Sequence, residues 1–154
     1  MTSPVTIYAG QPVLATDFDA YENLTAVWTS FTPTWASFGT QPAIGNGTLS
    51  GKYTRVGNYV AFSIQLVPGS TTTFGTSEYT LTTPTSIATN TMCGAFLEDN
   101  SAGLRYTGSA RIDASSIGLV AIVFANGTSG WTAGSPVTLA TNDIVRFAGV
   151  YEGA

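Results

Sequence analysis

The chain has 154 residues and a mass of 16.0 kDa, which is enough for one domain of sandwich size with a short appendage and too little for a second core. Only 9% of the residues are charged, well below the ~25% of ordinary soluble domains, while 44% are hydrophobic. The net charge is −4 and the five basic residues are scattered along the chain, so no basic patch is available to neutralise a nucleic-acid backbone.

Residues 1–15 are predicted to form an extended arm. They contain no basic stretch followed by an apolar run, and no stretch of the chain approaches the length of a membrane span, so we expect neither a signal peptide nor membrane insertion. The alternative is a frayed terminus. If the segment is an arm, four apolar residues are its expected anchoring contacts: Val5, Ile7, Tyr8 and Leu14.

Residues 16–29 are predicted to form one amphipathic helix. Thr16 is a good N-cap, and Asp19 follows it three residues later as an imperfect capping box. Four apolar residues recur at helical spacing: Phe18, Tyr21, Leu24 and Trp28. A helix this short is marginal alone in water, so this stripe must pack on its own domain, on two other copies, or on another subunit. The arm and helix define an anchoring region, residues 1–30, before a head domain, residues 31–154.

A β-hairpin is the most strongly predicted element of the head. After a connector over 30–47, in which Trp35 and Phe38 are expected to cap the sandwich, alternation begins at Leu49 and runs to Val56. Gly57 and Asn58 then supply a two-residue turn. The returning strand, 59–66, should point one set of side chains into the core: Val60, Phe62, Ile64 and Leu66.

The remaining sequence predicts more strands and no second helix. Turn residues separate expected strands at 78–82, 91–97, 104–112, 117–125, 136–139 and 143–151. This spacing of about ten residues indicates an all-β fold, an antiparallel sandwich or barrel of jelly-roll type, of which we expect the sandwich. The segment 117–124 is apolar on both faces, so we expect it to be covered by the core on one side and by a neighbouring subunit on the other.

The run Pro33-Thr34-Trp35, the segment from Gly39 to Gly57 and the segment from Gly69 to Gly75 carry a resemblance to a known module. Their density of Gly, Thr and Trp resembles small fibre, minor tail and capsid-surface proteins of tailed bacteriophages, especially phages of actinobacteria. The resemblance covers roughly 31–152. It implies a protein of the virion surface, made in the host cytoplasm and associated with a major capsid or tail protein, and together with the low charge it implies a homotrimer.

The sequence offers little for catalysis or metal binding. It has no histidine, which excludes Ser-His-Asp and Cys-His nucleophiles and His-ligated metals. Cys93 is the only cysteine, which excludes a disulfide framework, and we expect it to be a small buried hydrophobe. The turn Glu98-Asp99-Asn100-Ser101 lacks the ligand spacing of a dedicated calcium loop. We therefore expect no enzyme, no cofactor and no metal.

Two other functions stay open. In a glycan-binding adhesion module, Trp131 in the Gly-rich loop 126–135 would stack on a sugar; the alternative, which we favour, is that Trp131 covers one end of the sandwich. In a polysaccharide-degrading enzyme, a pair such as Glu98 and Asp113 would act together, although both lie in predicted turns. The function we expect is a non-enzymatic virion surface protein docked through residues 1–30, as a capsid decoration or head fibre slightly more than as a minor tail protein.

Overall fold

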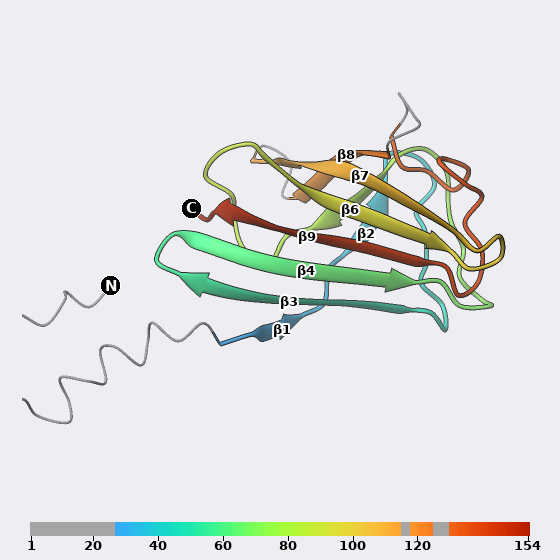
Figure 1. Ribbon diagram of the computed structural model, residues 1–154, viewed down its shortest axis with the longest axis horizontal. Coiled ribbons are helices and arrows are strands. Elements are labelled where there is room, and N and C mark those ends of the chain that lie inside the picture. The colour runs from blue at the N-terminus through green and yellow to red at the C-terminus, as the bar shows by residue number, and fades with distance from the viewer. Residues whose placement is uncertain (1–26, 115–117, 125–129) are drawn as a thin grey trace, which may run out of the picture.

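The computed structural model of the chain describes residues 27–114, 118–124 and 130–154, the segment 118–124 by its backbone alone. These residues form an all-β, antiparallel, sandwich-like fold without a helix (Figure 1). Accordingly, the described ranges hold no helix capable of crossing a membrane. The expected anchoring residues from Val5 to Leu24 lie outside the described residues, and so do residues 16–26 of the expected helix.

Nine strands form one hydrogen-bonded sheet. They are β1 (Thr29–Phe31), β2 (Trp35–Ser37), β3 (Thr48–Val56), β4 (Tyr59–Val67), β5 (Tyr79–Thr82), β6 (Thr91–Asp99), β7 (Leu104–Asp113), β8 (Gly118–Phe124) and β9 (Ile144–Glu152). Their order is β1-β3-β4-β9-β6-β7-β8-β5-β2, so the two short strands β1 and β2 are the edges of the sheet. The C-terminal strand β9 lies between β4 and β6 near its middle.

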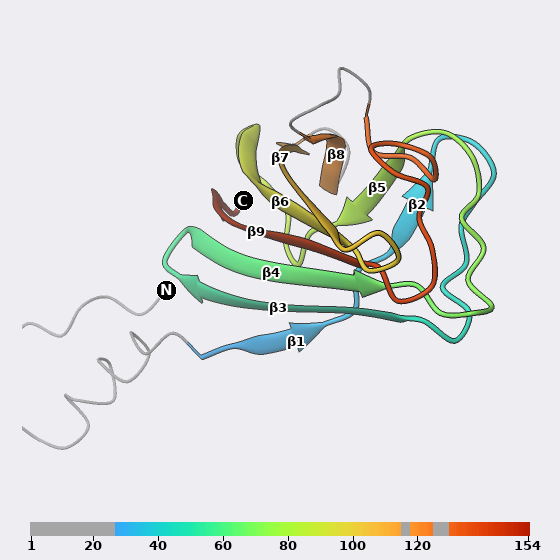
Figure 2. The same cartoon turned by 45° about the vertical axis from the view of Figure 1, so that its right-hand side comes forward.

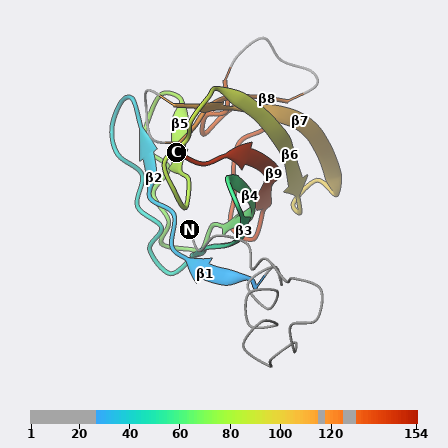
Figure 3. The same cartoon turned by 90° about the vertical axis from the view of Figure 1, so that its left-hand side faces the viewer.

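The sheet curls so that its two ends face each other. Figure 1 shows β5 and β2 behind β6 and β9, and Figure 2 shows them turned out to the right of these strands. Figure 3 shows the curl end-on, with β2 and β5 across the interior from β4, β9 and β6. One surface of the sheet therefore encloses the core. The opposite surface of β1, β3, β4, β9, β6 and β7, called the outer face below, looks away from it.

The predicted hairpin is confirmed. Strands β3 and β4 pair along their length from Thr48↔Val67 to Val56↔Tyr59, and Gly57 in the turn has a φ of 59°, which glycine adopts without strain. The four residues predicted to face the core are each at most 2% exposed: Val60, Phe62, Ile64 and Leu66. Because side chains alternate between the faces of a strand, Lys52, Ser63 and Gln65 lie on the outer face.

Aromatic rings fill one end of the core. Trp131 contacts Tyr79 at 4.8 Å between ring centroids, Phe147 at 5.6 Å and Trp35 at 6.4 Å. Trp35 in turn lies 5.1 Å from Tyr79. Burial of such rings supplies a large part of the apolar area removed from water, so this cluster joins β2 and β5 to the long strands.

Three expectations about the elements are wrong. The connector over 30–47 contains strand β2 and most of β1, and residues 136–139 are not a strand. The expected helix cannot reach residue 29, since Val27 and Trp28 are not helical and Thr29 begins β1. In each case sheet pairing or its absence decides the outcome: Thr29–Phe31 pairs with β3, and Trp35–Ser37 pairs with β5.

Candidate binding surface

The predicted site residues differ in whether the structure describes them and in how exposed their side chains are. Of the expected anchoring residues only Trp28 is described. Its side chain is 49% exposed beside β1, and the Nζ atom of Lys52 lies 5.0 Å from the centroid of its ring. This distance is in the range of a cation–π interaction, which ties Lys52 to the start of the described chain.

Trp131 does not form an exposed glycan platform. Its side chain is 1% exposed, and its backbone oxygen accepts a hydrogen bond of 3.0 Å from the amide of Tyr79. A sugar cannot stack on a ring covered by Trp35, Tyr79 and Phe147. The expectation that Trp131 is buried at the end of the sandwich is confirmed, and its ring offers no exposed surface for a sugar.

The acidic residues hold turns and strands together. Asp143 is fully buried; its Oδ1 accepts from the amide of Asn100 at 3.0 Å and its Oδ2 from the amide of Ala140 at 2.8 Å. Asp99 accepts from the hydroxyl of Ser101 at 2.7 Å and from the amide of Ala102 at 2.9 Å. These hydrogen bonds favour the charged form and lower the pKa of Asp99.

The carboxylates suggested for an enzymatic pair are each joined to arginine. Glu98 forms an ion pair with Arg105 at 2.7 Å, and Asp113 with Arg111 at 2.8 Å. In the part of the chain that the structure describes, no three acidic or cysteine side chains gather as they would around a metal ion. Cys93 is buried, and burial raises the pKa of its thiol to about 12.

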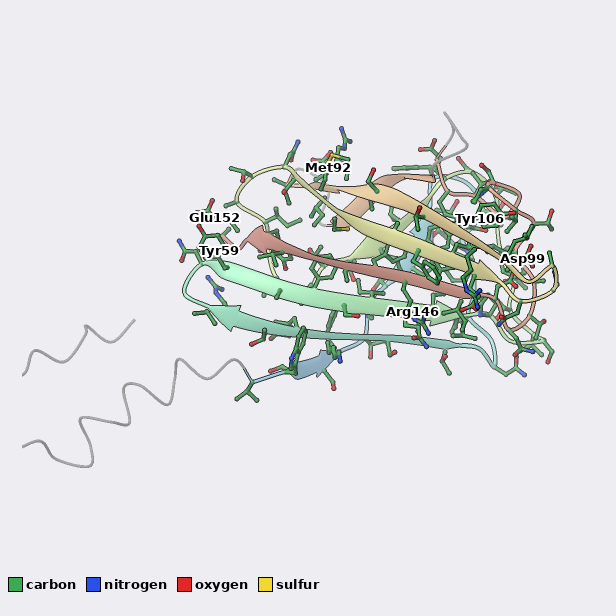
Figure 4. The ribbon with its side chains drawn as sticks, in the orientation of Figure 1. Tyr59, Met92, Asp99, Tyr106, Arg146 and Glu152 are labelled. Carbon is green, nitrogen blue, oxygen red and sulfur yellow. The ribbon has the colours of Figure 1, made fainter. Side chains whose placement is uncertain are left out.

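The outer face carries an apolar patch at one end. Among the described residues, eight large apolar side chains are exposed, and five of them belong to this face. The five, called the apolar patch below, are Trp28, Val56, Tyr59, Met92 and Val150. Figure 4 shows Tyr59, Met92 and Glu152 at the same end of the sheet.

The strand register explains why these residues gather. Val56 pairs with Tyr59, and Ala61 pairs with Val150. Continuing the β6–β9 register two residues beyond Gly94↔Ala148 brings Met92 opposite Val150. The patch therefore continues across neighbouring strands of one face.

A polar groove follows the apolar patch along the outer face. It has a volume of about 370 Å³ and is lined by Ser30, Ser50, Gly51, Lys52, Ser63, Gln65 and Arg146. Arg146 also lines a smaller pocket of about 200 Å³ on the neighbouring strands β6 and β9, beside Phe96. Figure 4 shows the side chain of Arg146 on this face, away from the end marked by Tyr59.

The two cations of this groove differ from the other three of the chain. Arg105 and Arg111 are in ion pairs, and the Nε of Arg55 donates to the backbone oxygen of Gly57 at 2.8 Å. Within the described ranges, Lys52 and Arg146 form no ion pair with a carboxylate. The Nε of Arg146 donates instead to the neutral Oε1 of Gln65 at 3.0 Å. Their positive charge is thus available to a ligand.

Sequence reasoning missed this groove. The alternation of side chains in the two hairpin strands puts Lys52 and Gln65 on the same solvent-facing surface, and this part of the groove could be read from the sequence. The contribution of Arg146 could not be read in this way, because β9 follows β4 only after four intervening strands and pairs with it through long-range hydrogen bonds.

A third cavity is apolar and lies between the segments that join β1 to β2 and β2 to β3. Its volume is about 460 Å³, and its lining residues include Pro33, Trp35, Pro42, Ile44 and Leu49. Trp35 itself is 8% exposed. The cavity offers no charged side chain to fix a ligand.

Comparison of the chain with protein-family models, with curated proteins and with solved structures finds no significant match.

Proposed function

We propose that this protein is a non-enzymatic structural component of a bacteriophage particle surface, a homotrimer of jelly-roll-type sandwiches. Residues 1–30 dock onto a major capsid or tail protein, and the head domain packs against its copies. A capsid decoration or head-fibre role is slightly favoured over a minor tail role. The resemblance of the segments around Trp35, Gly39–Gly57 and Gly69–Gly75 supports the phage context.

The apolar patch is the observation that carries the proposal. Exposed apolar side chains scattered singly are normal, but a continuous group on one face is typical of an interaction surface. Trp28, Tyr59 and Met92 are 49%, 68% and 63% exposed. Beside them the outer face has a small residue, Ala61, which allows another surface to approach closely.

A low charge density strengthens the same inference. With 9% charged residues, the chain has few side chains that would keep identical copies apart. Burial of the apolar patch between copies related by symmetry removes it from water, and closed rotational symmetry limits the assembly to a defined number of subunits.

Sedimentation velocity on the full chain tests the assembly. The wild-type protein is expected to sediment as a trimer, and the double variant Met92→Lys, Val150→Glu as a monomer, since it places charges in the middle of the patch. The matched control is Phe38→Ser, which removes an exposed ring, 66% exposed, in the segment after β2. A monomeric wild type contradicts the homotrimer, and equal dissociation of the control contradicts the assignment of its interface to the apolar patch.

Electron microscopy of intact particles tests the location. An antibody against residues 31–154 should label the phage that encodes the chain. Label over the whole shell would establish a decoration protein, and label at the tail would favour a minor tail or fibre protein. Unlabelled particles, with the protein detected only in the soluble fraction of the lysate, would contradict a structural role.

A glycan-binding adhesion module is the second candidate function. The specific observation that favours it is the polar groove with its two cations, in place of the buried Trp131. The same protein can serve both roles, since the groove and the apolar patch occupy different parts of the outer face.

A further inference from the structure

We propose that the groove between Lys52 and Arg146 binds an acidic glycan, a sugar chain that carries carboxylate or phosphate groups. This site lies beside the apolar patch and meets it where Lys52 contacts Trp28. It deepens the second candidate function given above, the glycan-binding module. Four strands, β1, β3, β4 and β9, supply its side chains, so its geometry is held by continuous sheet hydrogen bonds rather than by a loop.

The strand register places the polar groups in two adjacent rows. Ser30 pairs with Lys52, which pairs with Ser63 across β1, β3 and β4. In the next row Ser50 pairs with Gln65, which pairs with Arg146. The ligand would meet three hydroxyls, one amide and two cations. Hydroxyls and amides can both donate and accept, which suits sugar hydroxyls, while the cations suit an acidic substituent.

The guanidinium of Arg146 is oriented for this purpose. Its Nε donates to the Oε1 of Gln65, which fixes the plane of the group and leaves its terminal nitrogens for a ligand. Arg146 is an exposed residue of β9, and it also lines the neighbouring pocket together with Gly94, Phe96 and Ala148. A sugar ring bound there would have an apolar surface beside a charged one.

Lys52 is held at the other end of the groove. Its ammonium lies 5.0 Å from the ring centroid of Trp28, so the aromatic ring restrains the long side chain without neutralising it. Of the described residues that line the groove, none carries a carboxylate. In a chain with a net charge of −4, two cations without ion pairs in one groove indicate an anionic ligand.

The size and charge of the site define the class of ligand. A volume of about 370 Å³ falls in the range of small-molecule sites, ~300–1,000 Å³. Two cations are too few to follow the phosphate backbone of a nucleic acid. A short acidic saccharide matches both the volume of the groove and its mixture of hydroxyl, amide and cationic groups.

Isothermal titration of the full chain tests the site. The probes are trigalacturonic acid, an oligomer of glycerol phosphate, and neutral maltotriose as the uncharged control, all at low ionic strength. We expect at least one acidic probe to bind and maltotriose not to bind. Comparison of the two acidic probes distinguishes a carboxylated glycan from a phosphate-bearing one. If neither acidic probe binds at millimolar concentration, or if maltotriose binds as well, the proposal is wrong.

Matched charge variants locate the binding. Lys52→Gln and Arg146→Gln should each weaken binding about tenfold or more, as expected for loss of a charge-assisted contact. Arg55→Gln is the control, because Arg55 is exposed on the same strand β3, carries the same charge and lies outside the groove. Equal weakening by Arg55→Gln would reduce the effect to overall charge and overturn the assignment.

The same variants separate this inference from the proposed function. Lys52 contacts Trp28 of the apolar patch, so the separation rests on Arg146. Arg146 does not belong to the patch, and Arg146→Gln should keep the wild-type sedimentation coefficient. Loss of glycan binding with unchanged assembly supports the groove alone, whereas unchanged glycan binding refutes the groove and leaves the assembly result as it stands.

Discussion

The indole rings of Trp35 and Trp131 stack nearly parallel, with an interplanar angle of 14° and centroids 6.4 Å apart. Trp35 belongs to the edge strand β2, and Trp131 follows β8 in the sequence. Their contact joins the far edge of the curled sheet to the chain that leads into β9. Tyr79 packs against both rings, so a single aromatic cluster holds the two layers together at this end.

Trp131→Ala is therefore expected to be among the most destabilising single changes. Removing a buried tryptophan leaves a cavity and costs about 3–5 kcal/mol of unfolding free energy. Trp131→Phe should cost less, because it keeps part of the ring packing. Urea denaturation followed by circular dichroism measures both. Phe38→Ala, at a residue 66% exposed, is the control; a loss for Trp131→Ala no larger than for this control would contradict the role of the cluster.

Local sequence pattern predicted the long strands because their alternation matches the burial that the fold imposes. The residues from Val60 to Leu66 alternate strictly, and the turn at Gly57 and Asn58 fixes their register. The short edge strands were not predictable in this way. Thr29–Phe31 and Trp35–Ser37 have three residues each and are separated by Pro33, so local periodicity is too short to detect.

The candidate surface was predictable only in part, for the same physical reason. The face on which Lys52 lies follows from the hairpin alone. The arrival of Arg146 beside Gln65 depends on β9 inserting between β4 and β6, a non-local pairing that no single segment encodes. The buried position of Trp131 likewise depends on contacts with β2, β5 and β9, which are formed only in the whole fold.

Gly51→Ala should displace the ring of Phe31 from β3. A Cβ atom added at Gly51 would overlap the ring of Phe31, nearest at its Cε1 atom, so the ring must move away from β3. Overpacking of this kind costs about 1–3 kcal/mol, measured by urea denaturation. Gly134→Ala is the control, since an added Cβ there meets nothing within 4 Å.

A double variant distinguishes this clash from a general effect of alanine in the strand. When Phe31→Ala removes the ring, the added methyl at Gly51 has room. The effects of the two changes should then be non-additive, with Gly51→Ala costing less in the Phe31→Ala background than alone. Additive costs would show that the ring of Phe31 is not the source of the strain.

Asp143→Ala should loosen two turns at once. The carboxyl oxygens of Asp143 accept from the amides of Asn100 and Ala140, and the residue is fully buried. Two buried amides left without acceptors cost about 2–4 kcal/mol. Asp143→Asn, which retains one oxygen acceptor, should cost less. Hydrogen exchange by NMR should show faster exchange at Asn100 and Ala140, and unchanged protection there would contradict the assignment.

Alkaline pH should destabilise the fold through Tyr79 and Cys93. Burial raises the pKa of Tyr79 from 10.0 to about 12 and that of Cys93 from 9.0 to about 12. Both groups are favoured in their neutral form in the folded state, so their contribution is complete below pH 9 and is lost as the pH rises toward 12. For Cys93 the loss amounts to about 1.4 kcal/mol per pH unit above 9.

Cys93→Ala isolates the thiol's part of this effect. The variant loses some packing at every pH, but it has no thiol to ionise in the unfolded state. Between pH 8 and pH 10.5 the wild-type protein should therefore lose more unfolding free energy than Cys93→Ala, as measured by urea titrations at each pH. Parallel pH dependences would mean that Cys93 ionises equally easily in the folded and unfolded chains. The burial of Cys93 on β6, against Gly149 of β9, argues against that outcome.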